Sequence, residues 1–441
     1  MLDLILKNAN CLIEDKFETL DLGIKDGKIT ELPLSPGAQA TKTFDLKGLT
    51  VLPGLIDTQV HFREPGLTHK EDIAHGSRGA VKGGIVSFFE MPNTNPSTTT
   101  RESLEEKLNI AKKTSYSDYA FYLGASAENA QHLHTIEDLD GCCGVKIFMG
   151  SSTGNLLVES EQVLEQAFTS AKKRIALHCE DEERLKKRKQ ELFQEPVTVH
   201  THPLWRDEQT ALIATKKAVN LALKLKKQIH TLHITTAEEM SFLKENKNSL
   251  ISVECTPQHL TLSAPECYDR LKSLAQMNPP IREKRHLEAL WTGVQNKTVD
   301  IIGSDHAPHT LEEKNQDYPK SPSGMPGVQT TVLLMLEHIK KGRLSFQDLA
   351  RLMYHNPVRL FKIQNKLGIK VGSDADFTII DNNKSFQIEN SWMETKSGWT
   401  PFDGMKIPGS ITHTIVRGQP AMIDGELQER IESKNLSFEY N

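Results

Sequence analysis

The chain changes its pattern of apolar and polar residues twice, which divides it into a middle and two similar ends. Near both ends, short apolar runs alternate with turn residues; the clearest runs are Leu2–Leu6, Phe377–Asp381 and Ile411–Val416. Runs of this length between turns predict β-strands. Because both ends share the pattern, we expect residues 1–52 and 366–441 to form one small β-sandwich module.

Residues 53–365 alternate short apolar runs with stretches of helical periodicity. Thr99 and Glu102 have capping-box spacing and predict a helix that continues to Lys113. Strand and helix alternation predicts a parallel sheet, and about eight repeats predict an α/β fold of the TIM-like (β/α)8 barrel type. An open doubly wound sheet is the alternative, but no G-x-G-x-x-G turn follows a strand. The expected strands are Ile85–Phe89, Tyr119–Leu123, Gly144–Phe148, Ile175–Leu177, Ile229–Ile234, Ile251–Val253 and Val299–Ile302.

Length and composition limit the functional classes. The 441 residues suffice for a barrel of roughly 250 residues and a small module. A net charge of −5 and a pI of about 6.4 argue against a nucleic-acid surface. No apolar run approaches the roughly 20 residues of a membrane span, and the first eight residues are too short for a secretory signal. Six cysteines without a C-x-x-C pair predict free thiols in a reducing compartment. We therefore expect a cytoplasmic enzyme with no membrane partner.

Ionisable residues stand where the predicted barrel strands end. His61, Lys146, His178, His233 and Asp305 each occupy such a position. Taken singly, each has an ordinary explanation, such as a hydrogen-bonded histidine or an aspartate that caps a helix. In a barrel, however, the C-terminal strand ends form the active-site face. The five residues together therefore predict one site.

The first of these strand ends carries polar residues at every second position. Asp57, Gln59, His61 and Arg63 follow an apolar run at alternating positions. Side chains alternate faces along a strand, so we expect these four to point the same way. Four polar groups on one face at the end of a buried strand predict a functional site.

Lys146 stands between apolar neighbours, where a buried and unpaired ammonium would be costly. One explanation is that its side chain reaches the strand end and the solvent. The other is chemical, because burial depresses the pKa of a lysine and the free amine can take up CO2 as a carbamate. Imidazoles, a carbamate and an aspartate form a ligand set suited to Zn²⁺.

Seven motifs resemble those of the amidohydrolase superfamily and, within it, of class I dihydroorotases, over essentially the whole chain. They are Pro53-Gly54-Leu55-Ile56-Asp57, His61-Phe62-Arg63-Glu64-Pro65-Gly66, Met91-Pro92-Asn93-Thr94, Gly144-Val145-Lys146, Met277-Asn278-Pro279-Pro280-Ile281-Arg282, Ser304-Asp305-His306-Ala307-Pro308-His309 and Gly324-Met325-Pro326-Gly327. The resemblance implies reversible cyclisation of N-carbamoyl-L-aspartate to L-dihydroorotate in pyrimidine biosynthesis. It also implies one or two zinc ions, held by His61, N6-carboxylated Lys146 as the bridging ligand, His178, His233 and Asp305.

The resemblance also assigns roles in catalysis and substrate binding. It implies that a metal-bound hydroxide attacks the ring carbonyl, and that Asp305 takes its proton and delivers it to the ring nitrogen. Arg63, Asn93 and His309 would bind the carboxylate of the substrate, with Arg63 offering a bidentate fork. Asn278 would bind an amide edge of the ring.

The chain departs from the family at one position, because relatives usually carry His-x-His where this chain has Gln59-Val60-His61. A glutamine amide is a weaker zinc ligand than an imidazole. Gln59 could ligate weakly while two metals bind, only the site with His178 and His233 could fill, or catalysis could be impaired. We expect an active enzyme, because the proposed base and the carboxylate-binding residues remain.

Two other functions stay open alongside the dihydroorotase hypothesis. The chain could be another cyclic amidase, of the allantoinase or hydantoinase type, or an inactive dihydroorotase-like subunit that scaffolds aspartate transcarbamoylase. The resemblance favours a homodimer and leaves an association with aspartate transcarbamoylase open. The polar segment Thr310–Ser323 is expected to be either a mobile active-site loop or a passive surface connection.

Overall fold

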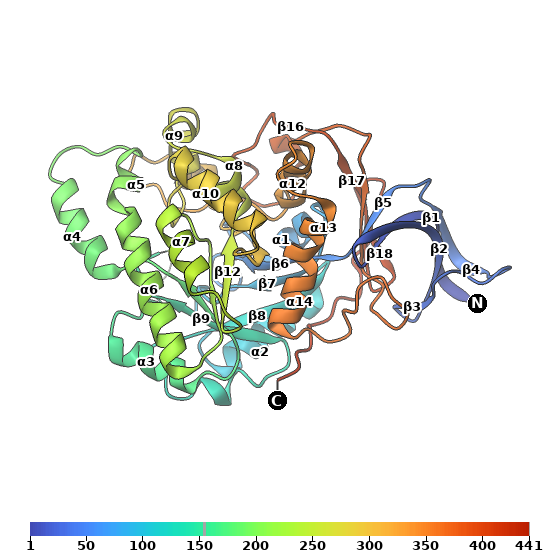
Figure 1. Ribbon diagram of the computed structural model, residues 1–441, viewed down its shortest axis with the longest axis horizontal. Coiled ribbons are helices and arrows are strands. Elements are labelled where there is room, and N and C mark those ends of the chain that lie inside the picture. Colours follow the sequence, from blue (N-terminus) through green and yellow to red (C-terminus); the bar gives the residue numbers. More distant parts are fainter. Residues whose placement is uncertain (153–155, 441) are drawn as a thin grey trace.

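A computed structural model describes residues 1–152 and 156–440 of the chain. Two sheets organise it: an eight-stranded barrel and a nine-stranded sheet built from both chain ends. In Figure 1 the barrel and its helices lie to the left, and the sheet with the N-terminus lies to the right. The predicted fold class is therefore confirmed.

The barrel strands follow one another in sequence order, and each pairs in parallel with the next. The barrel closes where Val60 and His306 form a bridge and the amide of His61 donates to the carbonyl of His306 at 2.7 Å. Parallel strands of this order place all their C-terminal ends on one face. The strands are β6 (Leu55–Val60), β7 (Ile85–Glu90), β8 (Asp118–Gly124), β9 (Cys142–Phe148), β10 (Ile175–His178), β11 (Ile229–Thr231), β12 (Ile251–Cys255) and β13 (Ile301–Ile302).

Helices connect the strands and cover the barrel. They are α1 (Ile73–Lys82), α2 (Arg101–Thr114), α3 (Glu161–Ser170), α4 (Glu182–Leu192), α5 (Thr201–Trp205), α6 (Glu208–Leu225), α7 (Ala237–Glu245), α8 (Pro257–Thr261), α9 (Glu266–Leu271), α10 (Lys284–Gln295), α11 (Leu311–Lys314), α12 (Thr331–Lys340), α13 (Phe346–Ala350) and α14 (Asn356–Phe361), with short turns η1 (Leu133–Thr135), η2 (Lys272–Ala275), η3 (Arg351–His355) and η4 (Asn390–Trp392). The predicted cap of α2 was wrong by one residue. Thr100, not Thr99, caps this helix, because its Oγ1 accepts from the Ser103 amide and the Ser103 hydroxyl closes the capping box.

The second sheet joins the two chain ends because β5 from the N-terminal part pairs antiparallel with β14 from the C-terminal part. Its strand order is β19-β18-β17-β14-β5-β1-β2-β3, with β4 paired to β1. A separate apolar core, with Leu4, Ile24 and Phe377, supports it. The domain limits at 52/53 and 365/366 stay a prediction. The strands are β1 (Leu2–Ile13), β2 (Lys16–Lys25), β3 (Lys28–Glu31), β4 (Ala40–Asp45), β5 (Thr50–Pro53), β14 (Phe377–Asp381), β17 (Ser410–Val416), β18 (Gln419–Ile423) and β19 (Glu426–Leu427), beside a separate pair β15 (Phe386–Gln387) and β16 (Lys406–Ile407).

The cysteines and the helices bear on the expected environment of the chain. All six cysteines are buried free thiols, as predicted. Within the described ranges, no helix combines the length and apolar character that a membrane crossing requires. The cytoplasmic location stays a prediction.

Candidate active site

The predicted ligands converge on one cavity at the C-terminal face of the barrel. The free space within this cavity and at its mouth is about 320 Å³. Its walls come from the ends of β6, β9 and β10 and from the segments that follow β11 and β13. The lining residues include Gln59, His61, Lys146, Phe148, His178, His233, Asn278, Asp305, Ser323 and Gly324. The parallel barrel thus brings together residues that are far apart in the sequence.

His178 ends β10, and its ring nitrogens have different partners. Nε2 lies 2.8 Å from Oε2 of Glu180, and Nδ1 lies 3.1 Å from Nε2 of His233. Burial raises the pKa of Glu180, but the charge of Arg206 and the bond from His178 outweigh it and lower the pKa to about 2. An ionised carboxylate only accepts hydrogen bonds, so His178 carries its proton on Nε2 and directs the Nδ1 lone pair at His233.

His233 completes this pair from an unexpected backbone position. The strand was expected to continue through Ile234, but β11 ends at Thr231, and His233 lies in the following loop with a φ of 37°. Within the described residues, its Nδ1 has no hydrogen-bond partner although it is buried. Burial holds the pKa of His233 well below its ordinary value, so the ring is neutral and able to bind a metal.

His61 and Asp305 form a second pair, with His61 Nε2 3.2 Å from Asp305 Oδ1. Nδ1 of His61 lies 2.7 Å from Oδ1 of Asn93 and donates to it. The Nε2 lone pair of His61 therefore faces a carboxylate oxygen. Two acceptors at this distance repel each other unless a proton or a cation lies between them.

Gln59 contacts the same aspartate through its nitrogen. Its Nε2 donates to Asp305 Oδ1 at 3.0 Å. Its Oε1 is buried and has no hydrogen-bond partner within the described part of the chain. In this orientation the amide of Gln59 acts as a donor that holds Asp305.

Lys146 lies in β9 and is only 1% exposed. Its Nζ stands 4.5 Å from the ring centroid of Phe148, and no hydrogen bond or ion pair ties it to the described residues. Burial lowers its pKa to about 7. Lys146 therefore holds a large share of free amine near neutral pH, the form that reacts with CO2.

The donor set fits a divalent metal held by nitrogen and oxygen atoms. Two imidazole nitrogens bound to one tetrahedral zinc ion stand about 3.4 Å apart, given bond lengths of roughly 2.0–2.1 Å. The 3.1 Å separation of His178 and His233 is close to this value. The lone pair of His61 that faces Asp305 also suits a cation. The predicted ligands thus stand as two pairs with Lys146 in the same cavity.

The predicted carboxylate-binding residues lie beside the cavity. Arg63 Nη2 is 3.3 Å from His309 Nε2, and Arg63 Nε donates to the carbonyl of Pro308. Burial lowers the pKa of Arg63 to about 10, so it is a cation at neutral pH. The expected alternation along 57–63 was wrong for Arg63, because β6 ends at Val60 and Arg63 has a φ of 63°. The loop, not the strand, directs its side chain.

Asn278 reaches the cavity from the other predicted substrate-binding segment. It is half-buried, and its Oδ1 lies 3.1 Å from Nε2 of His202. His202 is fully buried and also contacts the carbonyl of Met277. His202 thus holds the side chain of Asn278 in place through this hydrogen bond.

The buried side chains of Lys314 and Gln276 hold the segment Thr310–Ser323 against residues of the barrel. Nζ of Lys314 donates to the carbonyl oxygens of Gln276, Pro322 and Gly324 at 3.1, 2.8 and 2.9 Å. The side chain of Gln276 adds bonds to Ser321 and Ser323. The mobility of this segment stays a prediction.

Besides His202, three residues that the sequence did not single out support the site. Glu180 holds His178, while Lys70 and Glu313 lie against His309. Glu180 follows His178 by two residues, a spacing that could have suggested it. Glu313 has capping-box spacing with Thr310, which indicates a helix start, but no sequence signal placed it or Lys70 beside His309.

Among the residues that the structure describes, two further groups of three possible metal ligands lie outside this site; they are Glu71, Asp72 and His75, and Glu208, Glu283 and His286. Both carboxylate oxygens of Glu71 already accept hydrogen bonds, including those from Thr395 and His306. Nδ1 of His286 accepts from the Ala237 amide, so its Nε2 carries the proton and cannot bind a metal. Neither group is assigned a metal.

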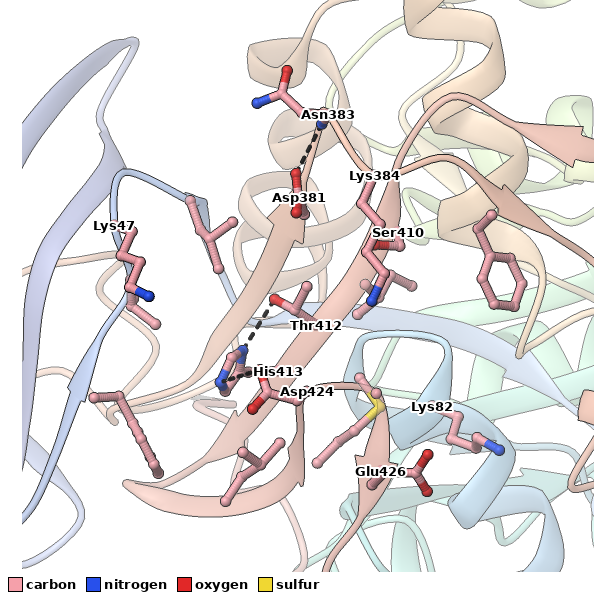
Figure 2. A pocket seen from close by; sticks show the side chains of 18 of the residues that line it. Lys47, Lys82, Asp381, Asn383, Lys384, Ser410, Thr412, His413, Asp424 and Glu426 are labelled. Carbon is pink, nitrogen blue, oxygen red and sulfur yellow. Dashed lines mark hydrogen bonds and ion pairs between the residues drawn. The ribbon is translucent and has the colours of Figure 1, made fainter.

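A larger open cavity, with about 1870 Å³ of free space including its mouth, lies beside the second sheet. Figure 2 shows His413 between Thr412 and Asp424, with Lys47, Lys82 and Lys384 further apart. His413 Nδ1 bonds to Thr412 at 3.0 Å, and its Nε2 is 3.7 Å from Asp424. This cavity offers a single imidazole–carboxylate pair and is not assigned catalytic chemistry.

The barrel and the ligand set at its strand ends define a metal-dependent hydrolase of the (β/α)8 class. Residues 50–421 match the model of the amidohydrolase family, and the chain belongs to this family. It is 37% identical to the dihydroorotase of Pyrococcus abyssi over 92% of each chain. It is 35% identical to that of Methanosarcina acetivorans, over 98% of this chain and 94% of that protein.

Solved structures show the same fold. The L-hydantoinase (dihydropyrimidinase) of Arthrobacter aurescens superposes with a TM-score of 0.94 at 26% identity, over 99% of this chain and 100% of that one. A D-hydantoinase (dihydropyrimidinase) from Thermus sp. gives a TM-score of 0.90 at 24% identity over 99% of each chain, which shows a shared fold.

Proposed function

We propose that this chain catalyses the reversible cyclisation of N-carbamoyl-L-aspartate to L-dihydroorotate, a step of pyrimidine biosynthesis. The similarity to archaeal dihydroorotases supports this reaction. The observation that carries it is the buried Arg63 beside His309, at the edge of a cavity lined by metal-type ligands. A guanidinium matches a carboxylate in bidentate geometry, and the ring carboxylate of L-dihydroorotate supplies one for Arg63.

We assign the metal to zinc, with one or two ions per chain. His178, His233 and N6-carboxylated Lys146 would hold one ion, and His61 with Asp305 would hold a second. The metal would supply a Lewis acid for the ring carbonyl and a water molecule of lowered pKa. Because Gln59 presents its nitrogen to Asp305, it is not counted as a ligand.

Asp305 is the proposed general base and acid. Gln59 and His61 both contact its Oδ1, which leaves Oδ2 to take a proton from the attacking water and pass it to the ring nitrogen. Asn278 at the cavity wall would hold an amide edge of the ring. Asn93 bonds to His61 and would orient that imidazole while contributing to carboxylate binding.

Two alternatives make different predictions. The structural similarity to an L-hydantoinase favours another cyclic amidase. Rings of that type carry no carboxylate for Arg63 and His309 to bind. A scaffold for aspartate transcarbamoylase would not require this buried group. A homodimer and an association with aspartate transcarbamoylase are proposed from the family resemblance alone.

The test is turnover of L-dihydroorotate by the zinc-loaded protein, beside Asp305→Ala and Arg63→Met. We expect turnover that Asp305→Ala abolishes, and a KM that rises about 100-fold in Arg63→Met, the loss expected for a buried charged hydrogen bond of about 3 kcal/mol. Hydantoin and 5,6-dihydrouracil should be poorer substrates.

Preferred turnover of these carboxylate-free rings would support the hydantoinase alternative, and no turnover of any ring by folded, zinc-loaded protein would support the scaffold. Metal content and a mass increase of one CO2 test the zinc and Lys146 assignments.

A further inference from the structure

Lys70 and Glu313 form a second layer behind the carboxylate-binding pair. Lys70 Nζ lies 3.1 Å from Nδ1 of His309 and 3.0 Å from Oε1 of Glu313. Both side chains are shielded, with 14% and 25% exposure. Oε2 of Glu313 also accepts from the Thr310 amide at the start of α11, which fixes the carboxylate. Lys70 therefore occupies a defined place against the His309 ring.

The contacts of His309 determine which ring nitrogen carries its proton. An ammonium only donates, so Nδ1 of His309 must accept from Lys70. The proton is then on Nε2, which lies 3.1 Å from the carbonyl of Ser323 and donates to it. The opposite tautomer would rely on longer contacts, at 3.3 Å to Arg63 and 3.6 Å to Glu313, and would set two donors or two acceptors against each other at both 3.1 Å contacts.

We propose that Lys70 is a positioning residue for substrate binding: held by Glu313, it keeps His309 in the tautomer whose Nε2–H faces the substrate carboxylate. This inference rests on the proposed function. The Nε2–H of His309, which here donates to the Ser323 carbonyl, donates to the substrate carboxylate once the substrate binds. Without Lys70, the proton can move to Nδ1, where Glu313 accepts it, and Nε2 then presents a lone pair to an anion.

The charges of the cluster agree with this role. Arg63 and Lys70 are cations, and Glu313 is an anion because the Lys70 ammonium, 3.0 Å from its Oε1, and the Thr310 amide both donate to its carboxylate. The three groups sum to one positive charge, which one substrate carboxylate neutralises. Lys70 thus contributes to anion binding through His309, without touching the substrate.

The experiment compares Lys70→Met with Lys70→Arg, which keeps a cationic donor, and with Lys320→Met, an exposed lysine of the neighbouring segment. In Lys70→Met we expect the KM for L-dihydroorotate to rise about tenfold, equivalent to about 1.4 kcal/mol, while kcat stays within twofold. Lys70→Arg should restore most of the affinity, and Lys320→Met should match the wild type. Turnover of 5,6-dihydrouracil, which lacks the carboxylate, should not change.

An unchanged KM in Lys70→Met would overturn the proposal, and so would equal losses with both rings, which indicate a merely structural role. Binding of N-carbamoyl-L-aspartate, measured by calorimetry on the zinc-loaded proteins, needs no turnover and separates this inference from the proposed reaction. A tenfold weaker Kd in Lys70→Met supports the role of Lys70. This holds even if the wild type shows no turnover, a result that would count against the proposed reaction only. Equal Kd values in Lys70→Met and the wild type overturn the proposed role of Lys70. If Lys70→Met does not fold, Glu313→Gln, which removes the charge that holds Lys70, serves in the same comparison and should weaken binding in the same direction.

Discussion

Replacing Lys314 by methionine tests whether one side chain holds the 310–323 segment closed over the site. The side chain is fully buried, and its Nζ donates to the carbonyl of Gln276, outside the segment, and to those of Pro322 and Gly324 at the segment's C-terminal end. All three bonds are lost when residues 310–324 unfold locally. Methionine keeps most of the apolar stem and removes all three donors. The perturbation is therefore confined to the bonds that close the segment.

The structure gives the size of the effect. A buried acceptor that loses its donor costs about 1–3 kcal/mol, and the lower value applies here because these carbonyls regain water when the segment lifts. Three carbonyls at about 1 kcal/mol each lower the free energy of opening by roughly 3 kcal/mol. At 1.4 kcal/mol for each factor of ten, the open state becomes roughly 100-fold more populated.

Hydrogen exchange measures this population directly. We expect amides of residues 310–324 to exchange roughly 100-fold faster in Lys314→Met, with strands β8, β9 and β10 unchanged. Lys320→Met, exposed in the same segment, is the matched control and should exchange as the wild type does. Unchanged exchange of 310–324 would refute the reasoning. Faster exchange throughout the barrel would show that Lys314 stabilises the whole fold and not the 310–324 segment alone.

Three further outcomes are expected. Glu180→Gln, which weakens the hold on His178, should lower metal affinity by about 10–100-fold in competition with a chromophoric chelator, and equal affinity would contradict the assigned tautomer. Removing the metal with a chelator should abolish turnover and lower the thermal midpoint, and zinc should restore both; activity that survives chelation would exclude the metal-dependent reaction. Gly66→Ala should destabilise the protein by about 3 kcal/mol or more, because φ is +84° and the new Cβ would lie 1.8 Å from the Asn95 carbonyl oxygen; an unchanged unfolding midpoint in urea would contradict this strain.

The barrel could be predicted from the sequence because its signal is local. Each buried strand is a continuous apolar run, and each helix has its own periodicity, so their alternation is visible without any long-range contact. Element ends depend on competing hydrogen bonds and were less accurate. Thr100 and Ser103 reciprocate as a cap where Thr99 and Glu102 were expected. Likewise, β11 ends before His233 although the apolar run continues.

The sequence could predict only those site residues that stand at the end of a predicted strand. His61, His178 and Asp305 were found because parallel strands place their ends on one face, whatever their distance in sequence. Lys70 lies in a loop near the start of the barrel sequence and Glu313 in the short helix α11 near its end, and nothing in the local sequence of either residue indicates that the two meet at His309. Contacts of this kind follow from the folded loops and not from periodicity.

The consequence of Gln59 also required the structure. A glutamine can turn either its oxygen or its nitrogen toward the cavity, and the sequence does not distinguish the two. With the oxygen facing Asp305, two acceptors would meet at 3.0 Å, whereas the observed orientation gives a hydrogen bond. This bond engages one carboxylate oxygen of the proposed base and leaves the buried Oε1 of Gln59 without a partner within the described residues. The substitution therefore removes one potential ligand of the metal beside Asp305 and adds a donor that orients the base. For this reason we propose the pair His178 and His233, with Lys146, as the stronger metal site, and the proposed role of Asp305 does not require Gln59 to bind a metal.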